Sequence, residues 1–149
     1  MIRLVKSNIF PTIKLKENQN EFVTKEEKIQ KLLNNKNSKA YHILKDDCLI
    51  GFILLVMFDT KKFFMQDFRI DGKYQGNGLG KRALDLLIEE LRNEDVVILT
   101  TTYTYGNNNA KKLYEKIGFI ETDIVDDRDV QEVNMIYRFE GEKICIKWI

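Results

Sequence analysis

Three glycines, Gly76, Gly78 and Gly80, lie in a short segment just ahead of a stretch with helical apolar spacing. Glycine has no Cβ, so main-chain N–H groups can converge there on an anion, and the N-terminus of the following helix adds a positive dipole end. Lys81 and Arg82 bring two cationic side chains to the same place. The chemistry that fits is a pyrophosphate held mainly by main-chain amides, and the competing interpretation is a tight structural turn.

Two common phosphate-binding motifs do not explain this turn. A P-loop requires Gly-x-x-x-x-Gly-Lys-Ser/Thr, but Gln75 stands where the first glycine belongs and Arg82 follows Lys81. A dinucleotide fingerprint, Gly-x-Gly-x-x-Gly/Ala, is met nominally by residues 78–83. The next predicted strand, however, ends in three threonines and lacks the acid that would bind the ribose. Neither motif therefore identifies the ligand.

Two ordered segments resemble one enzyme family. Gln75-Gly-Asn-Gly78-Leu-Gly80 resembles the Gln/Arg-x-x-Gly-x-Gly/Ala signature of the GCN5-related N-acetyltransferases, which use acetyl-CoA. Residues 109–119 are similar to that family's Asn-x-x-Ala/Ser…Tyr-x-x-x-Gly-Phe helix, with Asn109 and Tyr114 at the matching positions. One predicted strand separates the two segments, as in the family, so the resemblance covers about residues 61–120.

The resemblance implies a fold and an activity. The fold would be the acyl-CoA N-acyltransferase fold, an α+β arrangement with a mixed, mainly antiparallel sheet, splayed central strands and about four flanking helices. Residues 1–149 would form a single N-acetyltransferase domain. Acetyl-CoA would be the co-substrate, a primary amine would attack it directly, and no metal would be needed.

The resemblance also assigns cofactor-binding residues. The main chain of Phe68, Arg69 and Ile70 is expected to lie against the pantetheine arm, as a neighbouring strand would. Asn109 is expected to contact the cofactor as well. The turn expected to hold the pyrophosphate consists of Gln75, Gly76, Asn77, Gly78, Leu79, Gly80 and Lys81.

The implied reaction needs an oxyanion donor, an acid and a base. A main-chain N–H of the splayed strand can stabilise the oxyanion, a contribution of about 2.7–4 kcal/mol at other such sites. Tyr114 is the candidate general acid for the leaving thiolate, and a core tyrosine is the alternative. Asp67 is the candidate general base, directly or through water, and a solvent-facing strand residue is the alternative. His42 and Cys145 are poorer candidates, because each lies in a predicted strand with a structural role expected.

The acceptor is predicted from shorter motifs. Residues 4–23 and 141–147 resemble the ends of the bacterial diamine and polyamine (spermine/spermidine) acetyltransferases, so a small polyamine or diamine is the expected acceptor. Residues 121–132 hold six acids and one Arg. In this fold that segment borders the acceptor pocket, where negative charge would attract a polycation. The alternative is a solvated charged loop.

Three other functions stay open. The acceptor could be another small amine, such as an aminoglycoside-like antibiotic, or the N-terminus of a protein. A non-catalytic regulator that binds acetyl-CoA is the third alternative. The joint presence of Gln75, Gly78, Gly80, Asn109 and Tyr114 disfavours that last interpretation.

The elements that must position these residues follow from apolar periodicity. Strands are expected at residues 2–5, 40–45, 49–58, 61–70 and 96–103, and in a final hairpin of 133–139 and 143–149. Helices are expected as two amphipathic segments between 9 and 33, at 81–92, and at 107–117 with Gly118 as the stop. Hairpins mixed with helices indicate an α+β fold around a mixed sheet.

Composition limits the class of protein further. The 149 residues are 44% apolar with a formal net charge of +1, which disfavours disorder and a general nucleic-acid binder. The N-terminal residues lack a signal peptide and no apolar run is long enough to span a bilayer, so a cytoplasmic protein without membrane partners is expected. Cys48 and Cys145 are expected to be buried thiols. A single His disfavours a metal site, and a homodimer is left open.

Overall fold

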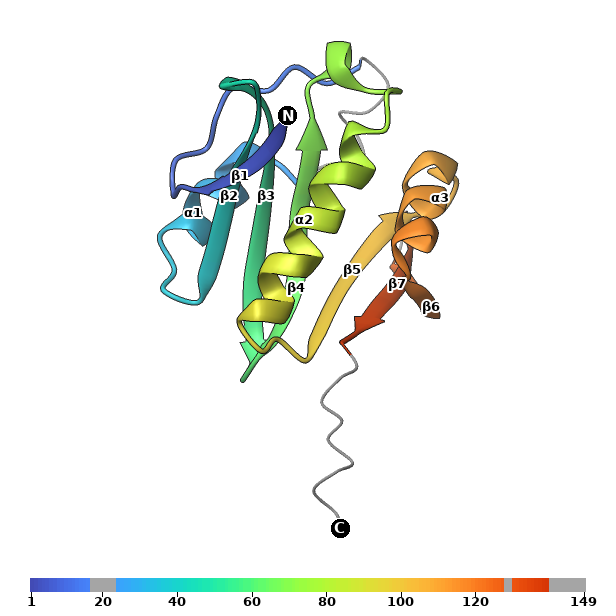
Figure 1. The fold of residues 1–149 in the computed structure, drawn as a ribbon. Coiled ribbons are helices and arrows are strands. Elements are labelled where there is room, and N and C mark those ends of the chain that lie inside the picture. The colour runs from blue at the N-terminus through green and yellow to red at the C-terminus, as the bar shows by residue number, and fades with distance from the viewer. Residues whose placement is uncertain (17–23, 128–129, 140–149) are drawn as a thin grey trace.

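A seven-stranded mixed sheet organises the protein, with the strand order β1-β2-β3-β4-β5-β7-β6 (Figure 1). The computed structural model describes residues 1–16, 24–127 and 130–139. Neighbouring strands are antiparallel except for β4 and β5, which are parallel and are connected through a helix. The strands are β1 Ile2–Lys6, β2 Ser38–Lys45, β3 Cys48–Asp59, β4 Lys62–Ile70, β5 Ile98–Thr104, β6 Ile120–Asp127 and β7 Val130–Arg138.

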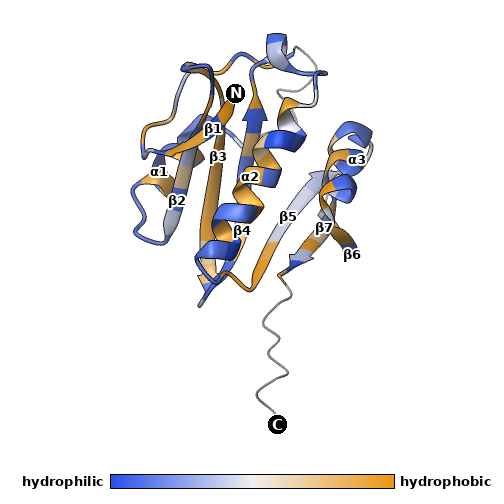
Figure 2. Ribbon diagram, in the orientation of Figure 1, coloured by the Kyte–Doolittle hydropathy of each residue, from blue (hydrophilic) through white to orange (hydrophobic). Residues whose placement is uncertain are grey.

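Three α-helices in the described ranges cover the two faces of this sheet. α2 and α3 pack on one face and α1 packs on the other (Figure 1). The sheet is therefore covered on both sides, and β3, near its middle, is buried without a break from Ile50 to Leu55. Figure 2 shows the matching hydrophobic character along β3. The helices are α1 Glu26–Leu33, α2 Leu79–Asn93 and α3 Asn108–Ile117.

The parallel pair at the centre of the sheet comes apart. β4 and β5 are paired at only three positions, from Lys62 opposite Ile98 to Phe64 opposite Thr100. Beyond Phe64, β4 continues to Ile70 without a partner on its β5 side, and the two strands diverge (Figure 1). The mixed, mainly antiparallel sheet and the splayed central strands expected from the sequence are thus confirmed.

The N-terminal region differs from the expectation. α1 is one of the two predicted helices between residues 9 and 33, but residues 11–16 have no regular secondary structure. Phe10 and Ile13 pack against the core on the α1 side of the sheet, and the Lys14 carbonyl accepts a hydrogen bond from the Gly72 N–H at 2.6 Å. The apolar residues Phe10 and Ile13 therefore pack this segment onto the sheet and are not part of a helix. Residues 17–23, where the rest of that helix was predicted, lie outside the described part.

The helices after the glycine turn agree with the sequence. α2 buries one apolar face against the sheet, and the Asn107 side chain caps α3 by accepting from the Ala110 N–H at 3.3 Å. Gly118 ends α3 with a φ of 120°, a conformation that side chains with a Cβ rarely adopt. The predicted stop at Gly118 is therefore confirmed.

The acidic segment 121–132 is not a loop. Most of it belongs to β6 and to the start of β7, which pair antiparallel with each other. β6 lies at the edge of the sheet formed by the described residues, and charges on an edge strand discourage pairing with a strand of another chain. The predicted strand 133–139 is confirmed as part of β7, whereas its proposed partner, residues 143–149, lies outside the described residues.

The cysteine prediction needs a correction as well. Cys48 is exposed rather than buried, because it begins β3 directly after a turn in which Asp46 and Asp47 both have positive φ. Its Sγ lies 3.5 Å from the Tyr74 hydroxyl. Cys145 lies outside the described part of the chain. The lone His42 has the structural role expected, with Nε2 at 2.7 Å from the Ile9 carbonyl oxygen.

Candidate active site

The divergence of β4 and β5 opens a cleft of about 980 Å³. Its wall combines the two strands with the glycine turn, the first turns of α3 and the start of α1, a size and setting common for ligand sites. Asn77 and Leu79 are not part of the wall, although the sequence placed them in the turn around the pyrophosphate. The expected site residues that do line it are Asp67, Phe68, Arg69, Ile70, Gln75, Gly76, Gly78, Gly80, Lys81, Asn109 and Tyr114.

The glycine turn has the geometry of an anion cradle. Gly76 and Gly78 have φ values of 84° and 77°, and a Cβ built on either would meet no atom within 4 Å. Gly78 is the N-cap of the 15-residue α2, whose unpaired N–H groups and positive dipole end lie at this point. The turn thus combines main-chain donors with open space, which fits a phosphate-bearing ligand. Lys81, at the start of α2, forms an ion pair with Asp85 at 2.9 Å.

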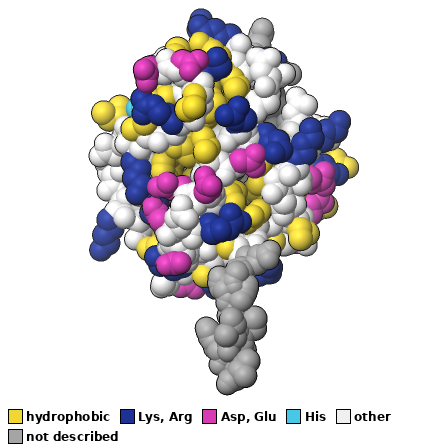
Figure 3. All heavy atoms as spheres, viewed as in Figure 1, with side chains coloured by type: hydrophobic (Ala, Val, Ile, Leu, Met, Phe, Trp, Pro, Cys, Tyr) yellow, Lys and Arg dark blue, Asp and Glu magenta, His cyan; other side chains and the backbone are white. Residues whose placement is uncertain are grey.

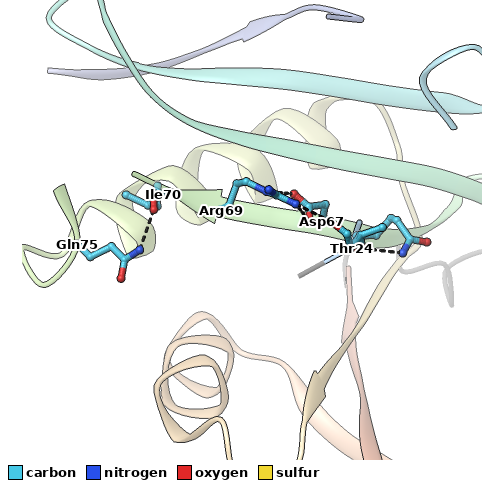
Figure 4. Close-up of polar contacts among 6 residues, drawn as sticks. Thr24, Asp67, Arg69, Ile70 and Gln75 are labelled. Atoms are coloured by element: carbon cyan, nitrogen blue, oxygen red, sulfur yellow. Dashed lines mark hydrogen bonds and ion pairs between the residues drawn. The ribbon is translucent and has the colours of Figure 1, made fainter. Parts of the chain in front are cut away.

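Along the unpaired edge of β4, only alternate residues direct their main-chain N–H and C=O groups into the cleft. The Asp71 N–H bonds to the Ile50 carbonyl on β3, and polar groups of alternate residues in an antiparallel strand point to the same side. Arg69 therefore directs its main-chain groups to β3, and Phe68 and Ile70 direct theirs to the cleft. The Ile70 carbonyl accepts from Gln75 Nε2 at 2.8 Å (Figure 4), which ties the turn to the end of β4.

Arg69 contributes to the site through its side chain instead. Its guanidinium holds both carboxylate oxygens of Asp67, with Nε to Oδ2 at 2.7 Å and Nη2 to Oδ1 at 2.8 Å (Figure 4). The same Nη2 donates to the Thr24 carbonyl at 3.0 Å, and the guanidinium carbon lies 5.1 Å from the centre of the Phe10 ring. Arg69 therefore fastens the segment ahead of α1 to β4.

Asp67 is not a solvent-facing strand residue. It is 4% exposed, so that alternative is wrong, and the reason is the cover provided by Arg69 and the Thr24 segment. Burial raises the pKa of the Asp67 carboxyl above its ordinary value, while hydrogen bonds and charge from Arg69, with the Thr24 main chain, offset part of the rise. A carboxylate in this setting is a stronger base than an exposed one, and its two oxygens are already engaged.

Tyr114 reaches the cleft from α3 and is 7% exposed. Burial raises the pKa of its hydroxyl to about 12, the nearby Asp67 carboxylate adds to the rise, and a hydrogen bond with Thr101 opposes it. Its ring also packs against Phe119, with centroids 5.4 Å apart. Tyr114 is therefore both a core residue on an apolar helix face and a protonated donor on the cleft wall.

Several residues of the cleft wall were missed by sequence reasoning. Lys112 and Lys116 line the cleft from α3 together with Asn109, and Figure 3 shows basic side chains gathered over this helix. The spacing of three and seven residues from Asn109 puts all three on one helix face, a signal that was present in the sequence. Thr101 and Gln66 also line the cleft, but only the divergence of β4 and β5 exposes them to it.

The charge of the wall differs from the expectation. Of the residues in the acidic segment whose side chains the structure describes (121–125, 131 and 132), Glu132 alone lines the cleft. Glu121 is engaged instead by the Tyr103 hydroxyl at 2.7 Å and by Lys111 at 3.8 Å, and Asp123 accepts from the Asn134 side chain at 3.1 Å. The lysines on the wall are Lys16, Lys25, Lys28, Lys81, Lys112 and Lys116. The described wall is therefore basic rather than acidic.

The described ranges, residues 1–16, 24–127 and 130–139, have neither a metal-binding cluster nor a membrane-spanning helix. Within them, no three His, Cys, Asp or Glu side chains come together in a way that could hold a metal ion. None of the helices described there has the length and apolar character needed to cross a bilayer.

A splayed mixed sheet with a glycine turn at the open edge of β4 is the arrangement found in proteins that hold an acyl donor between two diverging strands. Residues 8–119 match the acetyltransferase (GNAT) family, and the chain belongs to that family. The fold is also that of a GNAT family acetyltransferase from Elizabethkingia anophelis solved with acetyl-CoA bound, with a TM-score of 0.74 at 16% identity over 93% of this chain and 98% of that one.

The names of two curated relatives give two different acetyl acceptors. The spermine/spermidine N(1)-acetyltransferase of Bacillus subtilis (strain 168) is 31% identical over 107 residues, which are 66% of this chain and 62% of that protein. The [ribosomal protein bS18]-alanine N-acetyltransferase of Haemophilus influenzae is 35% identical over 96 residues, 62% of this chain and 64% of that protein. The chain thus spans less than two thirds of the length of either relative.

Proposed function

We propose that this protein transfers the acetyl group of acetyl-CoA to a primary amine by direct attack of the amine on the thioester. The observation that carries the proposal is the unpaired edge of β4 next to a glycine turn with open space around it. A strand edge offers main-chain groups to an extended amide-bearing chain, and the turn offers donors to phosphates. In acetyl-CoA, the pantetheine arm is an extended chain with amide groups and the pyrophosphate follows it, so the two parts match the strand edge and the glycine turn in that order.

The proposed binding roles follow from where the residues lie. Phe68 and Ile70 carry the main-chain groups that face the cleft, and the Arg69 side chain, held by Asp67, ties that strand to the Thr24 segment. The turn from Gln75 to Lys81 holds the pyrophosphate through its N–H groups, with Gln75 also fixing the turn to β4. Asn109 contacts the cofactor from α3. Lys112 and Lys116, on the same helix face, add positive charge for phosphate groups.

The proposed chemistry uses groups already at the cleft. A free N–H on the open edge of β4 stabilises the charge that develops on the thioester oxygen. Tyr114 is protonated at neutral pH, as a phenol ordinarily is, and burial raises its pKa further to about 12; it donates to the leaving sulfur. Asp67, buried and raised in pKa, takes the ammonium proton of the acceptor directly or through water.

For the acceptor, a small polyamine or diamine remains the first proposal. Support comes from the likeness to the spermine/spermidine acetyltransferase and from Glu132, which lines the cleft beside Thr102 and Thr104. The lysines Lys25 and Lys28 at the start of α1 count against a polycation. A protein N-terminus is therefore the second candidate, supported by the likeness to the ribosomal-protein alanine acetyltransferase. A cytoplasmic location and a homodimer stay predictions.

An acceptor panel tests this proposal. Purified protein is incubated with acetyl-CoA and, separately, with spermidine, a diamine, an aminoglycoside and a short peptide with an N-terminal alanine, and the products are identified by mass. Acetylated spermidine made faster than acetylated peptide supports the first acceptor. Glu132→Gln should then raise the KM for spermidine, whereas Asp123→Asn, outside the cleft, should not. Tight acetyl-CoA binding without turnover on any amine would overturn the enzymatic proposal.

A further inference from the structure

The open edge of β4 offers several main-chain acceptors to a bound chain. Beyond Phe64, the last residue paired with β5, four carbonyl groups of β4 are available to partners other than β3. They belong to Met65, Gln66, Phe68 and Ile70, all on the cleft wall. Outward groups of a strand recur at every second residue, about 7 Å apart, so an extended chain with amide groups can pair with such an edge in more than one register. An open edge by itself therefore does not fix where a bound chain lies along β4.

Two of these carbonyls already bind threonine hydroxyls. The Thr101 hydroxyl, on β5, donates to the Met65 carbonyl at 3.2 Å. The Thr24 hydroxyl, ahead of α1, donates to the Gln66 carbonyl at 3.0 Å and accepts from Gln66 Nε2 at 3.1 Å. The acceptors nearest the point of divergence are therefore occupied by side chains from two other segments.

A third carbonyl is occupied at the far end of the edge. Gln75 Nε2 donates to the Ile70 carbonyl at 2.8 Å (Figure 4), and both residues line the cleft. A carbonyl can accept two hydrogen bonds, but the Gln75 amide stands where the N–H of a ligand would approach from the cleft. Among the residues that the structure describes, none donates to the carbonyl of Phe68. Phe68 is thus the one acceptor that this edge leaves open to a ligand.

We propose that the Gln75 side chain is a positioning residue for the acyl donor: by occupying the Ile70 carbonyl, it confines the pairing of the pantetheine arm to the carbonyl of Phe68. Thr101 and Thr24 close the other side of the edge in the same way. A single register brings the thioester to the same point each time the donor binds. The inference rests on the proposed acetyl transfer from acetyl-CoA.

A donor without phosphates separates this role from simple support of the glycine turn. S-acetylpantetheine has the thioester and the amide arm of acetyl-CoA but no pyrophosphate, so only the strand edge sets its register. Gln75→Met keeps the length of the side chain and removes its donor, whereas Gln75→Arg keeps a donor at the same position. Gln30→Met, at an exposed site on α1 outside the cleft wall, is the matched control.

The kinetic test follows release of the free thiol with the best amine of the panel. With S-acetylpantetheine, Gln75→Met should lower kcat and KM together, by about 2–10-fold, the range for one hydrogen bond. Both constants fall because part of the donor binds at Ile70 with its thioester out of place, and such unproductive binding leaves kcat/KM unchanged. Acetyl-CoA should be affected less, since its pyrophosphate also fixes the register. Gln75→Arg should restore most of kcat, and Gln30→Met should match the wild type.

A crystal structure of the wild type with CoA bound measures the register directly. An amide nitrogen of the pantetheine arm should lie within about 3.2 Å of the Phe68 carbonyl oxygen, with Gln75 still bound to Ile70. This measurement tests the inference even if Gln75→Met does not fold. In crystals of a folded Gln75→Met soaked with pantetheine, part of the ligand should pair with the Ile70 carbonyl instead.

The outcomes distinguish this inference from the proposed function. If the wild type transfers acetyl groups but the bound arm displaces Gln75 from Ile70, the inference falls alone. It also falls alone if Gln75→Met raises the KM for acetyl-CoA and leaves both constants for S-acetylpantetheine unchanged, because Gln75 then only supports the phosphate turn. If the wild type releases no CoA with any amine of the panel, the proposed function falls and this inference falls with it.

Discussion

Arg69 holds the carboxylate of Asp67 in a two-pronged ion pair on one face of β4, with both N–O distances below 3 Å. Residues two apart in a strand share a face, so the pair forms within the strand itself. The guanidinium also donates to the Thr24 carbonyl, 45 positions away in the sequence. The strand that carries the open edge is thereby connected to the segment that leads into α1.

Removal of Arg69 should destabilise the whole protein. Arg69→Met leaves the Asp67 carboxylate buried without its cation, which costs about 3–5 kcal/mol in comparable buried pairs. Urea denaturation of Arg69→Met against the exposed control Arg82→Met measures the loss. Adding Asp67→Asn to Arg69→Met should recover part of the stability, because the uncompensated charge is then removed. Equal stability of the two Arg variants would show that the pair contributes little.

Tyr114→Phe should separate binding from chemistry. The ring still fills its place against Phe119, so acetyl-CoA affinity should stay near that of the wild type. Loss of a general acid lowers rates by about 100-fold or more, so kcat should fall strongly while the KM for acetyl-CoA changes little. Tyr105→Phe, at an exposed tyrosine, is the control. An unchanged kcat in Tyr114→Phe would remove Tyr114 from the mechanism.

Glycine substitutions should distinguish backbone strain from ligand space. Gly78→Ala and Gly106→Ala both place a Cβ on a residue with positive φ, a strain of about 1–2 kcal/mol. Gly78 lies on the cleft wall at the N-terminus of α2, and Gly106 lies outside the wall. Both variants should melt earlier, but only Gly78→Ala should raise the KM for acetyl-CoA. A similar KM for both would argue against the glycine turn as the phosphate site.

The pH dependence of stability should reveal the ion pairs at Glu94. Burial alone would raise the pKa of Glu94, but Lys39 and Lys6 outweigh it and hold that pKa below its ordinary value of 4.5. Stability from a lowered pKa is fully present above the ordinary value and is lost as the pH falls through the folded-state pKa.

Glu94→Gln tests this dependence. At pH 7 it should lower the free energy of unfolding by about 0.2–1 kcal/mol, since the side chain is partly exposed. The difference from the wild type should shrink as the pH falls below the folded-state pKa, whereas Glu89→Gln, at an exposed site on α2, should show no such trend. Melting curves from pH 3 to 7 measure both; a difference that grows on acidification contradicts the assignment.

Local patterns allowed much of the site to be predicted from the sequence. The glycine spacing and the apolar face of α2 placed the turn, and the spacing of Asn109, Tyr114 and Gly118 placed α3 and its end. These features depend on backbone conformation and helical period, which neighbouring residues determine. The strands β1 to β5 and β7 were also predicted closely, because apolar residues recur in each of them, whereas β6 was not predicted as a strand.

Long-range contacts could not be predicted in the same way. The segment 121–132 was expected to border the acceptor pocket or to be a charged loop. Only the pairing of β6 with β7 shows that most of it is strand, and of its described side chains Glu132 alone joins the cleft wall. Cys48 looked like a core thiol until the turn before β3 exposed it. The basic character of the wall likewise depends on which helix faces meet across the cleft.

The sequence by itself determined a mixed α+β arrangement, the glycine turn, the helix that carries Asn109 and Tyr114, and the membership of an acetyl-CoA-using family. Only the tertiary structure decided that Asp67 is buried under Arg69 and Thr24, and that Thr101 and Tyr114 both line the cleft that opens where β4 and β5 diverge. The physical reason is that a residue's conformation follows from its neighbours in the chain, whereas its burial and its hydrogen-bond partners follow from segments far away in the chain.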